Sequence, residues 1–268
     1  MNETLHPTTS RATDVLAEIR DSALWLTINR ESVRNALNDS VLDTLADHIR
    51  GVSRHPEVRA IVLTGSGTRA FSAGGDLKAD SATFEFDYSR PSTSLADLMR
   101  AAFATTLPMI ARVNGHCLAG GMGLLGMCDL AVATEDARFG LPEVKVGMFP
   151  MQVVATLRRL LSERVIAELC FTGEPISARQ ALQVGLLNDV VPTSELDTRV
   201  AALLASVVKN SPTAIRRGKY ALRATLDMTI EQALAYMETQ LGTLSLTQDA
   251  REGLASFNQK RPPTWTGR

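Results

Sequence analysis

Residues 113–150 read VNGHCLAGGMGLLGMCDLAVATEDARFGLPEVKVGMFP, and this stretch decides the class of fold. The apolar run at 109–113 is typical of a buried strand, which the chain leaves through Asn-Gly before a glycine-rich segment. A short apolar helix is expected at 121–127 and a second buried strand at 130–133. Strands that alternate with short helices predict an α/β core with crossover connections.

The glycines of this stretch favour binding of an anion. Backbone N–H groups at a helix start lack helical partners, so the amide of Gly120 is a candidate donor to a developing oxyanion. Close packing of the helix on a strand is the structural alternative. The segment also matches G-x-G-x-x-G at residues 121–126, but several loop residues separate it from the strand and the helix is too short for a nicotinamide site.

Glu143 is the candidate acid or base. Pro142 fixes the backbone just before it, and its neighbours along the chain are apolar. A carboxylate in an apolar pocket has a raised pKa and can exchange protons near neutral pH, although a surface glutamate is the simpler interpretation. A third segment, AFSAGGDLK at residues 70–78, places adjacent glycines after another apolar strand, where their amides can face a ligand or form an ordinary tight turn.

Working outward, the remaining pattern divides the chain in three. Residues 1–12 are expected to form a flexible tail, residues 13–192 an α/β core, and residues 193–268 a helical section. In the core, strands are expected at 15–20, 24–29 and 60–64, and helices after the cap at 38–40 and at 94–106. In the last section, helical periodicity covers 196–208, 213–225, 230–244 and 249–257.

Composition excludes several classes of function. With 28 Lys+Arg against 29 Asp+Glu, no nucleic-acid or membrane partner is expected. Three cysteines without paired spacing and no signal peptide predict a cytoplasmic protein. The four histidines show no metal-ligand spacing, and Ser72 with His116 lacks the elbow motif of a hydrolase. Asp76 and Asp129 are expected to cap turns.

The order of these segments resembles the enoyl-CoA hydratase/isomerase (crotonase) family. The residues that carry the resemblance are Asn29-Arg30, Arg34-Asn35-Ala36-Leu37, FSAGGDLK, the stretch 113–150, and the ending FNQKRPPTW at 257–265. The resemblance implies a spiral of ββα units with a helical C-terminal trimerisation section, and a homo-oligomer that is a trimer or a dimer of trimers. It implies an acyl-CoA substrate with no separate cofactor and no metal.

The resemblance also assigns roles to residues. The amides of Gly75 and Gly120 would hold the thioester oxygen, and Glu143 would move protons. Coenzyme A would lie along Arg34, Ala36, Ala73, Asp76, Leu77 and Lys78, and a phosphate would meet Lys260, contributed by this chain or a neighbouring subunit. Met148 and Phe149 would add apolar surface near Glu143.

One position departs from the pattern of the best-known hydratases, which carry two glutamates around the reacting carbons. Gly123 stands where the second is expected. Its missing side chain is expected to leave a gap that fits a straight or branched acyl group and holds a water as second proton carrier. A hydratase with Glu143 as single acid/base is the first hypothesis. A Δ3-Δ2 enoyl-CoA isomerase and a non-catalytic CoA-binding protein are alternatives. The related 3-hydroxyisobutyryl-CoA hydrolases carry an aspartate where Met151 stands here, which argues against that activity.

Overall fold

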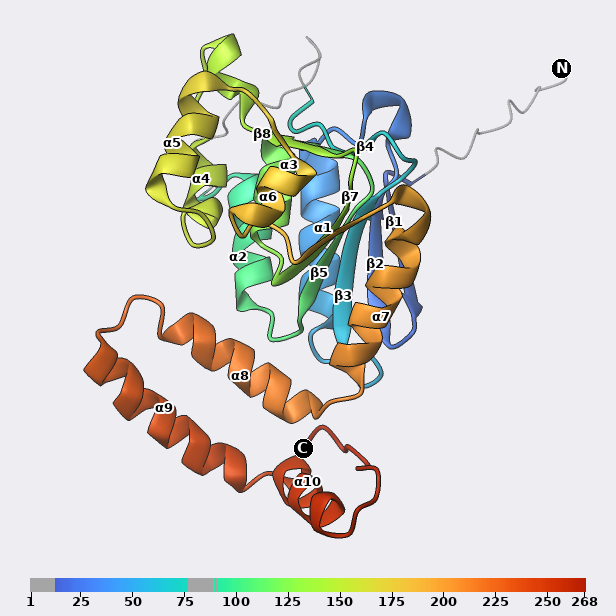
Figure 1. Cartoon of the computed structure of the whole chain (residues 1–268), viewed down its shortest axis with the longest axis vertical. Helices are drawn as coiled ribbons and strands as arrows, with labels where there is room; N and C mark the ends of the chain where they lie inside the picture. The colour runs from blue at the N-terminus through green and yellow to red at the C-terminus, as the bar shows by residue number, and fades with distance from the viewer. Residues whose placement is uncertain (1–12, 77–88, 90) are drawn as a thin grey trace, which may run out of the picture.

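The computed structural model describes residues 13–76, 89 and 91–268, and its largest element is a six-stranded sheet (Figure 1). The strand order is β1-β2-β3-β5-β7-β10, in which only β1 is antiparallel to its neighbour. The central strands are continuous apolar runs because helices cover both faces. The bounds are β1 Val15–Arg20, β2 Ala23–Ile28, β3 Ala60–Gly65, β5 Met109–Val113, β7 Leu130–Thr134 and β10 Asp189–Val191.

A second sheet of four short strands, in the order β4-β6-β8-β9, completes a structural repeat. Its strands are β4 Ala70–Ser72, β6 His116–Leu118, β8 Arg138–Gly140 and β9 Ile176–Ser177. Strands β3, β5 and β7 of the large sheet are each followed by one strand of the small sheet, β4, β6 and β8, and then by helix. This is the ββα repeat that the resemblance implies. Because β4, β6 and β8 run parallel, the segments that follow them leave the sheet at one edge.

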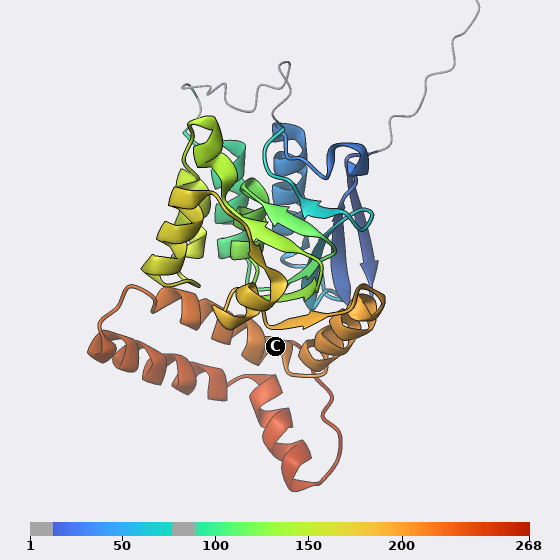
Figure 2. The same ribbon diagram turned by 45° about the horizontal axis from the view of Figure 1, so that its top comes forward.

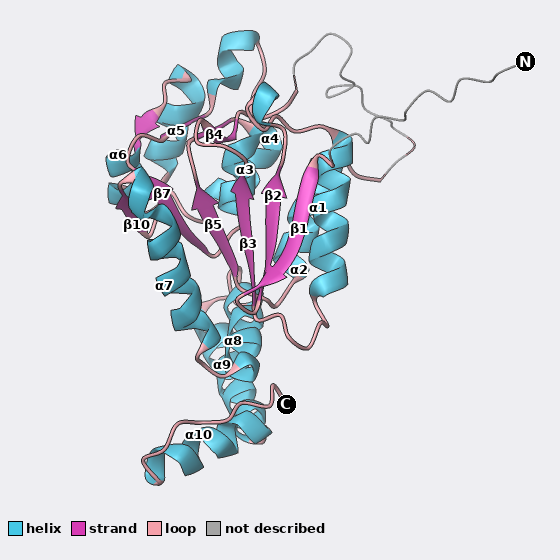
Figure 3. Cartoon of the chain, turned by 90° about the vertical axis from the view of Figure 1, so that its right-hand side faces the viewer, coloured by secondary structure: helices cyan, strands magenta, loops and turns pink. Residues whose placement is uncertain are grey.

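Helices cover both faces of the large sheet, with α1 and α2 on one side and α7 on the other (Figures 1 and 3). Asn38 caps α1 by accepting a hydrogen bond from the Val41 amide at 2.9 Å, as the sequence predicts. The main core lies between the sheet, α1, α2 and α3. The helices are α1 Asp39–Val52, α2 Ser94–Ala104, α3 Gly120–Gly126, α4 Met151–Leu157, α5 Glu163–Thr172, α6 Ala178–Gln183 and α7 Leu196–Val208, with short 3-10 turns η1 Glu31–Val33, η2 Pro142–Val146 and η3 Thr193–Glu195.

The C-terminal helices project from these layers (Figure 2). They are α8 Pro212–Ala224, α9 Ile230–Ser245 and α10 Gln248–Asn258, within two residues of the predicted bounds. α7, which the predicted division at 192/193 assigns to this section, instead packs on the sheet through Leu196, Val200 and Leu204. In α8, α9 and α10 many large apolar side chains are exposed, among them Leu222, Ile230, Leu241, Leu254 and Phe257. No helix in the described ranges is long and apolar enough to cross a membrane.

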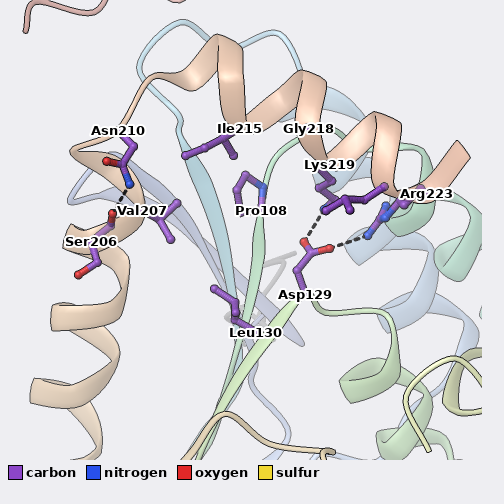
Figure 4. Close-up of a pocket in the computed structure, with 11 residues that line it drawn as sticks. Pro108, Asp129, Leu130, Ser206, Val207, Asn210, Ile215, Gly218, Lys219 and Arg223 are labelled. Carbon is purple, nitrogen blue, oxygen red and sulfur yellow. Dashed lines mark hydrogen bonds and ion pairs between the residues drawn. The ribbon is translucent and has the colours of Figure 1, made fainter. Parts of the chain in front are cut away.

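Asp129 does more than cap a turn, because its carboxylate holds α8 on the core (Figure 4). It accepts hydrogen bonds from the Met109 amide at 2.7 Å and from Lys219 Nζ at 2.5 Å, and it pairs with Arg223 at 3.0 Å. Burial lowers the pKa of Lys219 to about 8, while the charge of Asp129 opposes this shift. These charges stand beside a cavity of about 470 Å³ with mostly apolar walls between α7, α8 and the sheet. The cavity contains none of the glycine segments singled out in the sequence.

We expect Asp129→Ala to lower the free energy of unfolding by about 3 kcal/mol, because the buried Lys219 and the partly buried Arg223 lose their carboxylate. The matched control is Asp197→Ala, which breaks an ion pair with Arg112 through a carboxylate that is 79% exposed. That change should cost at most about 1 kcal/mol. Urea denaturation of both variants measures the difference. Equal losses would show that Asp129 does not anchor α8.

Candidate active site

The turns after β4 and β6 bring Gly75 and Gly120 together. A Cβ atom built on Gly120 would lie 3.7 Å from the Gly75 nitrogen. A Cβ built on Gly74 would lie 3.1 Å from the Gly120 nitrogen and 2.5 Å from the Ala119 Cβ. The two turns therefore pack closely, and glycine at 74 is required by both the close approach and a φ of 92°.

The amides of Gly75 and Gly120 have no acceptor among the described residues, whereas the neighbouring amides of Gly74 and Asp76 do. Gly120 is the first residue of α3, one residue earlier than the sequence suggests, so its N–H has no helical partner. Ala119 precedes it at φ 49° and ψ −123°, a conformation that costs a non-glycine residue about 1–3 kcal/mol. Two amides without an acceptor in the described part of the chain, beside a strained residue, are the kind of groups that can donate to an oxyanion.

The segment at 34–37 fixes the turn that carries Gly75. The Leu37 amide donates to the Gly74 carbonyl at 2.8 Å, and the Leu37 carbonyl accepts from the Asp76 amide at 2.9 Å. The Ala73 amide donates to the Arg34 carbonyl at 3.0 Å. The structure thus brings together Arg34, Ala36, Ala73 and Asp76 from the set predicted to bind coenzyme A. Leu77 and Lys78, also in that set, lie outside the described residues.

Arg30 is a positioning residue that the sequence reasoning missed. Its guanidinium donates to the Ala36 carbonyl at 2.6 Å, to Asp76 at 3.0 Å, and approaches Asp14 at 3.4 Å. Asp76 therefore forms an ion pair with Arg30, just after β2, and does not act only as a turn cap. The ion pair joins the segment at 34–37 to the residue directly after Gly75.

Two buried asparagines hold the start of β4. Asn35 donates to the carbonyls of Ser66 and Ala70, and Asn114 accepts from the Gly65 amide at 3.1 Å and also donates to the Ala70 carbonyl. Both are buried, and Asn35 adopts a left-handed φ of 55°. The Asn-Gly step after a buried strand was the only signal in the sequence for such a role, and it marked Asn114 alone.

Glu143 follows β8 in the first turn of η2, next to the turn after β6. The Ala119 amide donates to the Gly140 carbonyl at 2.9 Å, which links the two turns directly. The Glu143 side chain is partly buried, and its Oε2 is shielded from solvent with no hydrogen-bond partner among the described residues. Burial raises the pKa of Glu143 above its usual value, and burial followed by the charge of Glu143 raises the pKa of Cys170. A partly buried carboxyl group with one unpaired oxygen is suited to proton transfer.

Exposed apolar side chains follow Glu143 closely in the chain. Met148 and Phe149 are 42% and 38% exposed, and the Phe149 ring lies 6.5 Å from that of Phe171. The Met148 amide donates to the Glu143 carbonyl at 3.0 Å, so both ends of this segment are tied. These residues can contact an apolar group that approaches the carboxyl group.

The gap expected at Gly123 is already filled, which corrects the sequence interpretation. A Cβ atom on Gly123 would lie 2.6 Å from the Met99 Cε and 3.3 Å from the Val153 Cγ2. Neither side chain could be identified from its position in the sequence, since Met99 belongs to α2 and Val153 to α4. No room remains at this point for the predicted water.

The other polar candidates have structural partners or lie far from the glycine turns. Lys260 follows α10, at the end of the molecule opposite to α3 and β4, so within one chain it does not reach the glycine turns (Figure 1). His116 accepts from the Arg138 amide at 3.2 Å, and Ser72 accepts from the Gly74 amide at 3.2 Å. In the described part of the chain no group of His, Cys, Asp and Glu side chains could hold a metal ion.

Comparison with known proteins gives consistent matches along the chain. A sequence model described as enoyl-CoA hydratase/isomerase matches residues 18–268. The 2,3-dehydroadipyl-CoA hydratase of Escherichia coli is 37% identical over 262 residues, covering 95% of this chain and 99% of its own. The short-chain-enoyl-CoA hydratase of Clostridium acetobutylicum is 32% identical, covering 92% and 95%. The crystal structure of an enoyl-CoA hydratase from Bacillus anthracis superposes with a TM-score of 0.89 at 27% identity, covering 96% and 100%.

Proposed function

The chain belongs to the enoyl-CoA hydratase/isomerase family, and we propose that it is an enoyl-CoA hydratase that adds water to a 2-enoyl-CoA thioester. One observation carries the proposal: two unpaired amides, of Gly75 and Gly120, lie at the same sheet edge as the desolvated carboxyl group of Glu143. Amides stabilise the negative charge that a thioester oxygen gains, and the carboxyl group supplies the proton transfers.

The proposed reaction needs only these groups. The thioester oxygen accepts hydrogen bonds from both amides, which draws electrons from the conjugated double bond. Glu143 takes a proton from water as the water oxygen bonds to C3. The electron pair of the double bond then forms an enolate that the two amides hold. Glu143 then returns the proton to C2, so that one water is added and the carboxylate is regenerated.

We extend the proposal to substrate binding. We assign coenzyme A to the surface of Arg34, Ala36, Ala73 and Asp76 with the following Leu77 and Lys78, and the acyl group to the surface of Met148 and Phe149. Lys260 would reach a phosphate only from a second copy of the chain. The exposed apolar side chains of α8, α9 and α10 support a homo-oligomer, for which we propose a trimer or a dimer of trimers. No separate cofactor or metal is required, and three free, buried cysteines support a cytoplasmic location.

One set of assays on the purified full chain distinguishes a hydratase, an isomerase and a non-catalytic CoA-binding protein. A hydratase removes the ultraviolet absorbance of the conjugated thioester when mixed with a 2-enoyl-CoA. An isomerase with the same Glu143 instead creates that absorbance from a 3-enoyl-CoA, by carrying a proton between C2 and C4. Binding of both thioesters in calorimetry without a change in absorbance would overturn the enzymatic proposal and favour a CoA-binding protein.

The rate should depend on pH through Glu143. As the base, it must be ionised, and burial raises its pKa above the usual 4.5. We therefore expect kcat/KM to fall as the pH decreases, with a midpoint above 4.5. Steady-state rates between pH 4 and 8 measure this midpoint, with enzyme stability checked at each pH. A rate that stays constant down to pH 4.5 would contradict the role of Glu143 as base.

A further inference from the structure

Gly123 lies on the face of α3 that also carries Gly120. Residues three apart on a helix share a face, about 4.5 Å apart along the axis. With the thioester oxygen on the Gly120 amide, an acyl group that runs along this face of α3 would place its C2 beside residue 123. That surface is made by Met99 and Val153, which are 6% and 3% exposed.

The packing around Gly123 differs from that around Gly121, two residues earlier in α3. A Cβ on Gly121 would meet the Ser72 carbonyl oxygen at 2.6 Å, which is backbone that cannot move aside. A Cβ on Gly123 would meet the end of a methionine side chain at 2.6 Å, with Val153 next at 3.3 Å. Methionine has three rotatable bonds and fills irregular space, so the wall at residue 123 is formed by a movable group. Its position is set by side-chain packing and not by the backbone.

We propose that Met99 determines substrate specificity by forming, with Val153, the wall that faces C2 of the acyl group. The inference rests on the proposed function, which places the thioester oxygen on the two amides. The site then prefers acyl groups that are unbranched at C2, because a methyl branch there would meet the Met99 methyl group. The apolar side chains of Met99 and Val153 fill the space at residue 123. No second acidic side chain of the described residues stands there, so Glu143 is the single proton carrier.

Binding of two saturated, unreactive thioesters tests the proposal. We expect the wild-type chain to bind butanoyl-CoA at least about tenfold more tightly than 2-methylbutanoyl-CoA, the effect of one misplaced methyl group in an apolar pocket. In Met99→Ala the ratio of the two dissociation constants should fall to near one. Met122→Ala, a buried methionine on α3 outside this wall, is the matched control and should keep the wild-type ratio.

The outcomes separate failure of the inference from failure of the proposed function. If both thioesters bind and the ratio is the same in wild type and Met99→Ala, Met99 does not face C2. If neither thioester binds to the wild-type chain, the proposed function itself is wrong. Should Met99→Ala fold poorly, Met99→Leu keeps most of the volume but shortens the reach, and it should still lower the ratio.

A double-mutant cycle tests the packing without any ligand. Gly123→Ala should lower the melting temperature of the wild-type chain, because its Cβ displaces the Met99 methyl group. In the Met99→Ala background the same substitution should leave the melting temperature unchanged or raise it, since it fills the vacated space. Equal effects in both backgrounds would show that the two positions are not in contact.

Discussion

Replacing Glu143 by Gln is expected to lower kcat/KM for a 2-enoyl-CoA by about 10²–10⁴, the usual contribution of general acid–base catalysis. Glutamine keeps the size of the side chain but cannot take a proton from water. The amides of Gly75 and Gly120 would remain in place, so thioester binding should persist while turnover falls. The measurement is the initial rate of loss of the conjugated absorbance, together with the dissociation constant of a saturated acyl-CoA.

Stability gives an independent check on the same variant. Burial raises the pKa of Glu143 above that of the unfolded chain, so at pH 7 this carboxyl group destabilises the folded state relative to the unfolded one. Glutamine removes that cost, and Glu143→Gln should be at least as stable as the wild type at neutral pH. Glu174→Gln is the matched control. It makes the same substitution at a glutamate that is 71% exposed and pairs with Lys145, two residues after Glu143. Near-full activity of Glu143→Gln would remove Glu143 from the mechanism.

The sequence predicted the order of elements because the relevant signals are local. Apolar runs such as residues 60–64 and 109–113 form strands wherever both faces are covered, and the four C-terminal helical patterns follow from spacing alone. The three segments that carry chemistry were also recognisable, since each follows a strand and contains glycine or proline. That they meet at one edge follows from the parallel pairing of β4, β6 and β8, which the residues alone did not reveal and the resemblance only implied.

Contacts between distant residues could not be predicted in the same way. Met99 fills the space at Gly123 from another helix, so the sequence showed a missing side chain where the structure shows a filled wall. Asp129 was read as a turn cap because its partners Lys219 and Arg223 lie about 90 residues later, on α8. Arg30 joins Asp76 across 46 residues of sequence. In each case the two partners are brought together by packing of distant elements. Such a contact has no signature in the local periodicity or spacing of the sequence.

The proposed oxyanion site depends on the close approach of two backbone turns. Gly75 is held through the hydrogen bonds of Leu37, which join it to the segment after η1, and Gly120 is held by the start of α3 and the strained Ala119. Both residues are glycines, so only backbone contacts hold the two amides in place. A substitution that separates the two turns should therefore affect the rate far more than the fold.

Gly74→Ala is expected to lower kcat/KM by about 10²–10³, as loss of one oxyanion donor does, equivalent to about 2.7–4 kcal/mol in the barrier. The added Cβ would lie 2.5 Å from the Ala119 Cβ and 3.1 Å from the Gly120 nitrogen, so the two amides must move apart. The measurement is the initial rate on a 2-enoyl-CoA, with the melting temperature as the check on folding. Glu143 is unchanged in this variant, which separates the contribution of the amides from that of the carboxyl group.

Gly185→Ala is the matched control, because Gly185 has a similar φ of 84° but no atom within 4 Å of its added Cβ. Both variants place alanine in the left-handed region and should lose similar stability for that reason. Only Gly74→Ala changes the spacing of the two turns, so only it should lose activity beyond what its stability explains. Equal kcat/KM values for the two variants would show that the thioester oxygen does not rest between residues 75 and 120, and the enolate would then need another source of stabilisation.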